Sequence, residues 1–96
     1  MNAMPNKSIF VALRSKHWID FRDRRKSIEW RAWGARWNDR KIIPGSTIIL
    51  AKGYTRDRLR GVVVRVQRVS RSLAPDAALA IYPNVETFCA IEIALR

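Results

Sequence analysis

The chain has 96 residues, of which 48% are apolar, and its 19 basic and 8 acidic residues give a net charge of +11. This apolar content excludes a wholly disordered chain, and no apolar run approaches the roughly 20 residues that a membrane-spanning helix needs. A single cysteine, Cys89, and a single histidine, His17, exclude an internal disulfide and a zinc site with several thiolate or histidine ligands. We therefore expect no membrane association, no metal and no cofactor.

The length suits one domain, which we place over residues 1–96, with residues 1–7 as a flexible N-terminus. Residues 8–13 are apolar and rich in β-forming types, which predicts a buried strand. Residues 14–25 place apolar side chains at helical spacing among charged ones, which predicts a helix with Ser15 as a candidate cap.

The next segment, residues 26–31, alternates in polarity, which predicts a strand with two distinct faces. One face of this strand carries the apolar Ile28 and Trp30. The other face carries the polar Ser27, Glu29 and Arg31. Residues 33–41 are expected to follow as a loop or a short helix.

The middle of the chain predicts a hairpin. Pro44 and Gly45 form a turn signal, and residues 47–51 are a continuous apolar strand. Residues 53–59 form a charged loop, and residues 59–69 form a long strand with apolar residues on both faces. Such a strand is covered on both sides, as in a small barrel.

The last part of the chain predicts a short helix over residues 75–81, a turn over 82–84 and a closing strand over 86–95, with Cys89 in the core. The elements are mostly strands with short helices between them. We therefore predict an α+β fold, a β-barrel of about five strands with short flanking helices.

The positive charge is unevenly distributed. Residues 14–41 and residues 42–71 each carry a net +6, whereas residues 72–96 carry −2. A basic field of this size attracts polyanions, among which nucleic acid is the commonest in a cytosol, although a basic surface can also serve solubility alone. Residues 1–8 contain no apolar segment typical of a secretory signal, so we expect a cytoplasmic protein.

Lys26, Glu29 and Arg31 form the one polar cluster with a chemical character. A lysine beside a carboxylate in a partly desolvated cleft can act as a base or clamp a phosphate, and an arginine fork can grip a phosphate or a nucleobase edge. The alternative is a salt-bridged strand that only supports the barrel. His17, on the charged side of the predicted helix, is expected at the surface.

Four tryptophans lie close together in the sequence, interleaved with arginine and lysine: Trp18, Trp30, Trp33 and Trp37. Indole rings stack on nucleobases, but they are also common in cores. Trp18 and Trp30 match the apolar faces of their elements and are expected in the core. Trp33 and Trp37 lie among arginines, where a cleft and a core position are equally open.

A second basic group surrounds the predicted hairpin tip and includes Lys52, Tyr54 and Arg56. These side chains favour a phosphate-contacting loop, because a cluster of bases can bind a nucleic-acid backbone without reading its sequence. The alternative is a solvated turn that contacts no ligand.

The order of these elements and their short motifs resembles the ASCH domain, a family in the PUA-like superfamily of RNA-associated β-barrels. The residues that carry the resemblance come from four strands: Lys26, Glu29 and Arg31; Pro44, Gly45, Ile48 and Leu50; Gly61 and Val63; Phe88, Ala90, Ile91, Glu92 and Ile93. The chain is similar to short ASCH proteins of phages, prophages and bacteria. The resemblance implies a PUA-like barrel with RNA or a nucleotide as its partner.

The resemblance also implies a hydrolase as an alternative, because some ASCH proteins deacetylate N4-acetylcytidine and others have ribonuclease activity. The family's amidohydrolases use a lysine, a threonine and a glutamate. Lys26 matches the lysine, but Glu29 stands in place of the threonine. The segment before Tyr82 has no glutamate, with Asp76 as a candidate substitute. The triad is incomplete, and Lys26 and Glu29 remain the candidate catalytic residues.

These observations favour an RNA- or nucleotide-binding domain with a basic cleft around Lys26, Glu29 and Arg31. The candidate ligand-binding residues are Arg31, Trp33, Trp37, Lys52, Tyr54, Arg56 and Tyr82. A hydrolase of the ASCH type, acting on N4-acetylcytidine or on RNA, is the first alternative. A regulator of the kind that phages encode, which binds an acidic host protein, is the second.

Overall fold

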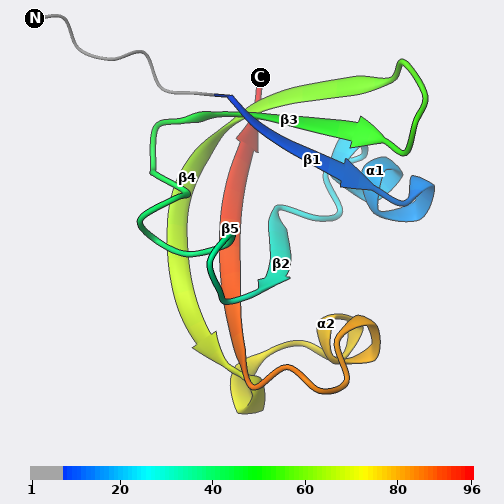
Figure 1. The fold of residues 1–96 in the computed structure, drawn as a ribbon. Coiled ribbons are helices and arrows are strands. Elements are labelled where there is room, and N and C mark those ends of the chain that lie inside the picture. The colour runs from blue at the N-terminus through cyan, green and yellow to red at the C-terminus, as the bar shows by residue number, and fades with distance from the viewer. Residues whose placement is uncertain (1–7) are drawn as a thin grey trace, which may run out of the picture.

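The computed structural model describes residues 8–96, so the N-terminus predicted to be flexible, residues 1–7, lies outside the described residues. The described chain forms a five-stranded sheet with the order β1-β3-β4-β5-β2, in which β1 and β3 are parallel (Figure 1). The strands are β1 (Ile9–Leu13), β2 (Ile28–Ala32), β3 (Thr47–Lys52), β4 (Arg58–Ser70) and β5 (Thr87–Leu95). Helix α1 (Ser15–Arg22) joins β1 to β2, and a 3-10 turn, η1 (Arg71–Leu73), with helix α2 (Asp76–Ile81) joins β4 to β5.

The sheet curls into a half-barrel, as the bent strands β4 and β5 show in Figure 1. A bulge at Val64 interrupts the pairing of β4 with β5, and a bulge bends a strand and increases its twist. The two sheet edges, β1 and β2, approach each other, and Arg31 donates a hydrogen bond to the Ala12 carbonyl across this seam at 3.4 Å. The predicted α+β fold with five strands and short helices is confirmed, as a curled half-barrel.

The core lies between the sheet and α1. Its largest fully buried side chains are Val11, Phe21, Ile48, Leu50, Val63, Cys89 and Ile91, and Phe88 is fully buried on the opposite face of β5. Trp18 is also buried, as predicted, and its indole N–H donates a hydrogen bond to the Leu50 carbonyl. Burial raises the pKa of the Cys89 thiol to about 11, and the predicted core position of this cysteine is confirmed.

Two glycines are required by the backbone. At Gly61, a Cβ would lie 2.7 Å from the Ala94 carbonyl oxygen and 2.9 Å from the Ile93 side chain, so only glycine allows β4 to approach β5 there. Gly45 has a φ of 93°, in the region that glycine favours, and the turn predicted from Pro44 and Gly45 is confirmed.

Helix α1 is shorter than the helix predicted over residues 14–25. It begins at Ser15, which is the first helical residue and not the cap, and it ends at Arg22. Arg24 then takes a φ of 62°, a left-handed conformation that a helix cannot continue through. Among residues 8–96, no helix is long and apolar enough to cross a bilayer.

Apolar residues occur on both faces of β4, but not because both faces of the strand are covered, as we predicted. Before the bulge, Gly61 and Val63 are buried, whereas after it Val66 packs against the core. The bulge at Val64 therefore moves the inward-facing positions by one residue. Val64 itself is 47% exposed, so the middle of the strand is not covered on both sides as we predicted.

Strand β5 is buried on both faces, and this sets the faces of β2. Glu29 pairs with Ile91 and shares its core face, whereas Trp30 points away from the core. Trp30 packs edge-on against Phe88, as Tyr82 does, with ring centres 6.0 and 5.9 Å apart. Trp30, which was expected in the core, is only half-buried and lies outside the core cluster, because a second, smaller layer covers the apolar face of β2.

Candidate functional site

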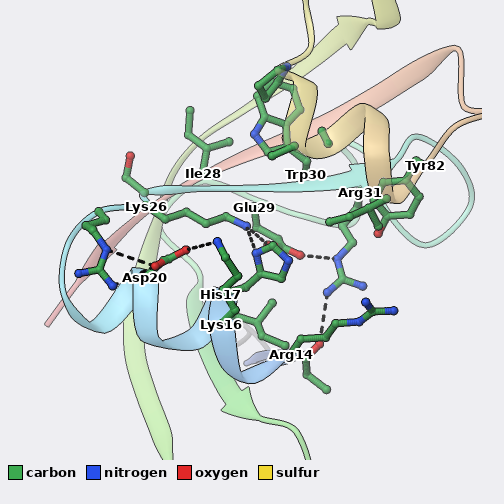
Figure 2. Close-up of a pocket in the computed structure, with 18 residues that line it drawn as sticks. Arg14, Lys16, His17, Asp20, Lys26, Ile28, Glu29, Trp30, Arg31 and Tyr82 are labelled. Atoms are coloured by element: carbon green, nitrogen blue, oxygen red, sulfur yellow. Dashed lines mark hydrogen bonds and ion pairs between the residues drawn. The ribbon is translucent and has the colours of Figure 1, made fainter.

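A cavity of about 400 Å³ lies beside the seam between β1 and β2 (Figure 2). Its lining comes from the end of β1, from α1, from β2 and from α2. This volume lies in the range of small-molecule sites. Five basic side chains against two carboxylates give the lining a net charge of +3: Arg14, Lys16, Arg25, Lys26 and Arg31, with Asp20 and Glu29.

A buried carboxylate holds two cations at the centre of this seam cavity. Glu29 is 5% exposed, and it accepts a hydrogen bond from Lys26 Nζ at 3.2 Å and another from Arg31 Nε at 2.7 Å. The two charge-assisted bonds fall on different carboxylate oxygens and compensate the charge inside the protein. The structure thus brings together the three residues that the sequence grouped.

Arg31 is held from three directions. Besides Glu29, its guanidinium contacts the Ala12 carbonyl, and it lies 4.9 Å from the ring centre of Trp37. A cation over an indole face is attracted by the ring quadrupole. Trp37 also packs against the core and does not line the cavity. It therefore positions Arg31 and is not placed to contact a ligand there.

His17, predicted at the surface, lines the cavity. Its Nδ1 lies 3.5 Å from Lys26 Nζ. Burial, and then the charge of Lys26, lower the pKa of His17 from its usual value. The imidazole is therefore mostly neutral at neutral pH, and it can accept a proton or a hydrogen bond inside the cavity.

The wall of the cavity next to α2 is apolar and aromatic. Trp30 and Tyr82 form it, and both rings are supported from behind by Phe88. Figure 2 shows Ile28 and Trp30 on the α2 side of β2, with the charged side chains on the α1 side. The cavity thus has one charged wall and one apolar wall, and β2 runs between them.

The rim of the cavity holds paired and unpaired cations. Asp20 accepts hydrogen bonds from Arg25 and Lys16, which hold the pKa of its carboxyl below the usual value. Arg14 is exposed and forms no ion pair with any part of the chain that the structure describes. Arg14 is therefore the cavity cation best able to receive an anionic ligand.

Several predicted ligand residues lie outside the cavity. Lys52, Tyr54 and Arg56 belong to the β3–β4 hairpin, and none of them lines it. Trp33 borders a separate hollow, where the Arg68 guanidinium lies 5.3 Å from its ring centre. Tyr82 does line the cavity. The fold therefore distributes the predicted ligand residues over several surfaces.

Arg14 and His17 are among the cavity residues that the predicted site did not include. The signal that could have found His17 is its helical spacing from Asp20, which places both on one face of α1. Asp76, the candidate substitute for the family's glutamate, is exposed and does not line the cavity. Residues 8–96 contain no group of three or more His, Cys, Asp or Glu side chains that could hold a metal ion.

Comparison with known proteins identifies no family for this chain. No protein-family model matches the sequence, and no curated protein matches it. The ASCH resemblance therefore rests on its motifs alone.

Proposed function

We propose that this chain is an RNA- or nucleotide-binding domain of the ASCH type, and that the seam cavity holds the ligand. One observation carries the proposal: a net charge of +3, a fixed Lys–Glu–Arg group and an aromatic wall share one cavity. A nucleotide has the matching two-part chemistry, since it joins an anionic phosphate to a flat base that stacks on aromatic side chains. The net charge of +11 supports long-range attraction of RNA.

The proposal gives each wall its role. Arg14 and Lys26 contact phosphate from the charged side, and Trp30 and Tyr82 contact the base or the ribose from the apolar side. Glu29 contacts no ligand oxygen, because like charges repel. It fixes the side chain of Lys26 and, with Trp37, that of Arg31, so the ligand meets preorganised donors.

A salt titration tests the proposal. A labelled single-stranded RNA should bind at low salt, and its affinity should fall steeply as salt rises, because phosphate contacts release counterions. Fluorescence anisotropy measures both. No binding at low salt, or an affinity that salt does not change, would overturn the proposal.

Substitution of Lys26 locates the site. Lys26→Met should weaken RNA binding at least about tenfold, or ~1.4 kcal/mol, and Lys26→Arg should restore most of it if the lysine contacts phosphate. Thermal melting of the same variants is the control. A lower melting temperature with unchanged RNA affinity would make Lys26 a scaffold residue.

A second candidate function, hydrolysis of N4-acetylcytidine or RNA, is favoured by one observation. His17, Lys26 and Glu29 form a row of groups with contacts of 3.5 and 3.2 Å. Such a row can pass a proton to or from a reacting group. Chromatography of N4-acetylcytidine and gels of single-stranded RNA after incubation test it. Intact substrate in both assays, with and without added divalent metal ions, would remove this candidate.

A further inference from the structure

Strand β2 has one open edge, because it pairs with β5 on one side and is the last strand of the sheet. The ladder with β5 is fixed at both ends: the Ile93 amide donates to the Ser27 carbonyl, and the Trp33 amide donates to the Thr87 carbonyl. In an antiparallel strand, the N–H and C=O of one residue point to the same side, and those of the next residue point to the opposite side. The direction of every N–H and C=O group along β2 follows from these two bonds.

Ile28 and Trp30 direct their backbone N–H and C=O groups away from β5, since Glu29 and Arg31 occupy the hydrogen-bonded positions. Within residues 8–96, no backbone or side-chain group bonds to these outward groups. Both residues line the seam cavity. Glu29 and Arg31, on the opposite face of β2, line it too, so the cavity extends around the open edge of the strand. The outward donors and acceptors of this edge therefore face the cavity and require partners.

We propose that this open edge recognises the Watson–Crick edge of an unpaired nucleobase, with Ile28 and Trp30 supplying the N–H donors and C=O acceptors. The inference rests on the proposed function and narrows it to single-stranded RNA or a free nucleotide. Sequence-specific RNA recognition commonly uses this edge of unstacked bases. In a duplex the same edge is already bonded to the partner base, so a paired strand cannot bind in this way.

The two walls of the cavity suit such a base. A planar ring that bonds to a strand edge lies near the plane of the sheet, and side chains of the strand point to both sides of that plane. One ring face then meets the Ile28 and Trp30 side, and the other meets the Lys26 and Glu29 side (Figure 2). The phosphate is then contacted by the exposed Arg14 at the rim and by the Lys26 ammonium on the charged side, as in the proposed function.

The seam favours a base over a peptide strand, which also adds to open sheet edges. The Arg31 side chain crosses from β2 to the Ala12 carbonyl of β1 and closes the edge beyond Trp30. A peptide strand usually pairs over several residues, and the edge inside the cavity offers two outward-facing ones. The net charge of +3 also favours a ligand that carries phosphate.

Proline substitution tests the backbone contact. Ile28→Pro removes one outward N–H and leaves the ladder to β5 intact, and proline is tolerated on edge strands where the N–H faces outward. Ile28→Ala shortens the same side chain but keeps the N–H. Ala32→Pro is the matched control, because the Ala32 amide also points outward but this residue does not line the cavity. Thermal melting checks that each variant folds.

The three variants are titrated with a labelled single-stranded RNA of mixed sequence, about ten nucleotides long, at low salt. Ile28→Pro should bind about tenfold more weakly than Ile28→Ala, because a base donor or acceptor loses its partner. Ala32→Pro should stay within about twofold of the unmodified chain. Equal affinities of Ile28→Pro and Ile28→Ala would overturn the inference.

A comparison of single-stranded and duplex RNA tests the same inference on the unmodified chain. The same RNA annealed to its complement keeps its phosphates but hides its Watson–Crick edges, so it should bind at least about tenfold more weakly. Equal or tighter duplex binding would overturn the inference and leave the proposed function standing. No binding of either RNA would overturn the proposed function itself. A strand-forming peptide that binds the unmodified chain but not Ile28→Pro would assign the edge to peptides and overturn the inference.

Discussion

The seam cavity and the β3–β4 hairpin (residues 52–58) are both basic, but they hold their charges differently. The hairpin carries three cations and one carboxylate, and its Tyr54 is fully exposed. Its ion pair, from Lys52 to Asp57, is 4.0 Å long and solvent-exposed at the aspartate. In the cavity, Glu29 is 5% exposed and bonds two cations at 3.2 and 2.7 Å.

The density of charge along a sequence therefore does not define a binding site. Water and salt screen the charges of an exposed hairpin, so it contributes to long-range attraction and to loose phosphate contacts. A cavity excludes water and fixes its donors, so the same residue types act there with greater strength and direction. Residues in or beside the cavity should therefore respond to substitution or to pH more strongly than residues of the hairpin.

The largest difference is expected in the free energy of unfolding, between substitutions of the cavity carboxylate Glu29 and of the hairpin carboxylate Asp57. Glu29→Gln should lower the free energy of unfolding by about 2 kcal/mol, because it leaves Lys26 and Arg31 facing each other without a counter-charge. Asp57→Asn should change it by less than about 0.5 kcal/mol, since exposed pairs contribute little. Urea unfolding measures both. Equal losses would mean that Glu29 is no better coupled than a surface residue.

The aromatic residues should differ next. Trp37→Ala should lower the free energy of unfolding by about 1–2 kcal/mol, because the half-buried ring packs on the core and on Arg31. Tyr54→Ala should leave stability within about 0.5 kcal/mol, as expected for an exposed side chain. A Trp37→Ala variant that keeps full stability would contradict its role in holding Arg31.

Arg14 in the cavity and Arg56 in the hairpin are both exposed. Neither forms an ion pair among residues 8–96, so their substitutions allow a direct comparison of RNA affinity. Arg14→Ala should weaken RNA binding about fivefold, whereas Arg56→Ala should weaken it less than about twofold. Anisotropy titrations at one salt concentration decide the comparison. The reverse order would move the binding site to the hairpin.

The smallest effect concerns pH. Because folding lowers the pKa of His17, the unfolded chain binds more protons than the folded one. The stability that His17 contributes is therefore present above its usual pKa of 6.5 and is lost as pH falls below it. Melting temperatures between pH 5.5 and 7.5 should show this small loss, and His17→Asn should remove it.

RNA binding should have the opposite dependence. A protonated imidazole adds a charge beside Lys16 and Lys26, against Asp20 and Glu29, so RNA affinity should rise about twofold as pH falls from about 7.5 to 5.5. The hairpin carries no histidine, so His17→Asn should make affinity independent of pH in this range. An unchanged dependence in that variant would assign the effect to another group.

Local patterns in the sequence were enough to predict the strands, the helices and their order. Alternation predicted β2, the apolar runs predicted β1, β3 and β5, and the Pro44–Gly45 signal predicted the turn, because these features depend on neighbours within a few residues. The grouping of Lys26, Glu29 and Arg31 was likewise predictable, since all three lie within six residues.

The side of each element that faces the cavity depends on the packing of the whole fold. Glu29 is buried because its strand pairs with β5 in a register that puts it opposite Ile91. His17 enters the cavity because Trp18 and Phe21 orient α1 on the core. The seam places Arg31 within hydrogen-bond distance of the Ala12 carbonyl, 19 residues earlier in the chain, and the Val64 bulge shifts the register of β4 against β5. These features depend on contacts between residues far apart in the chain, and local periodicity carries no information about such contacts.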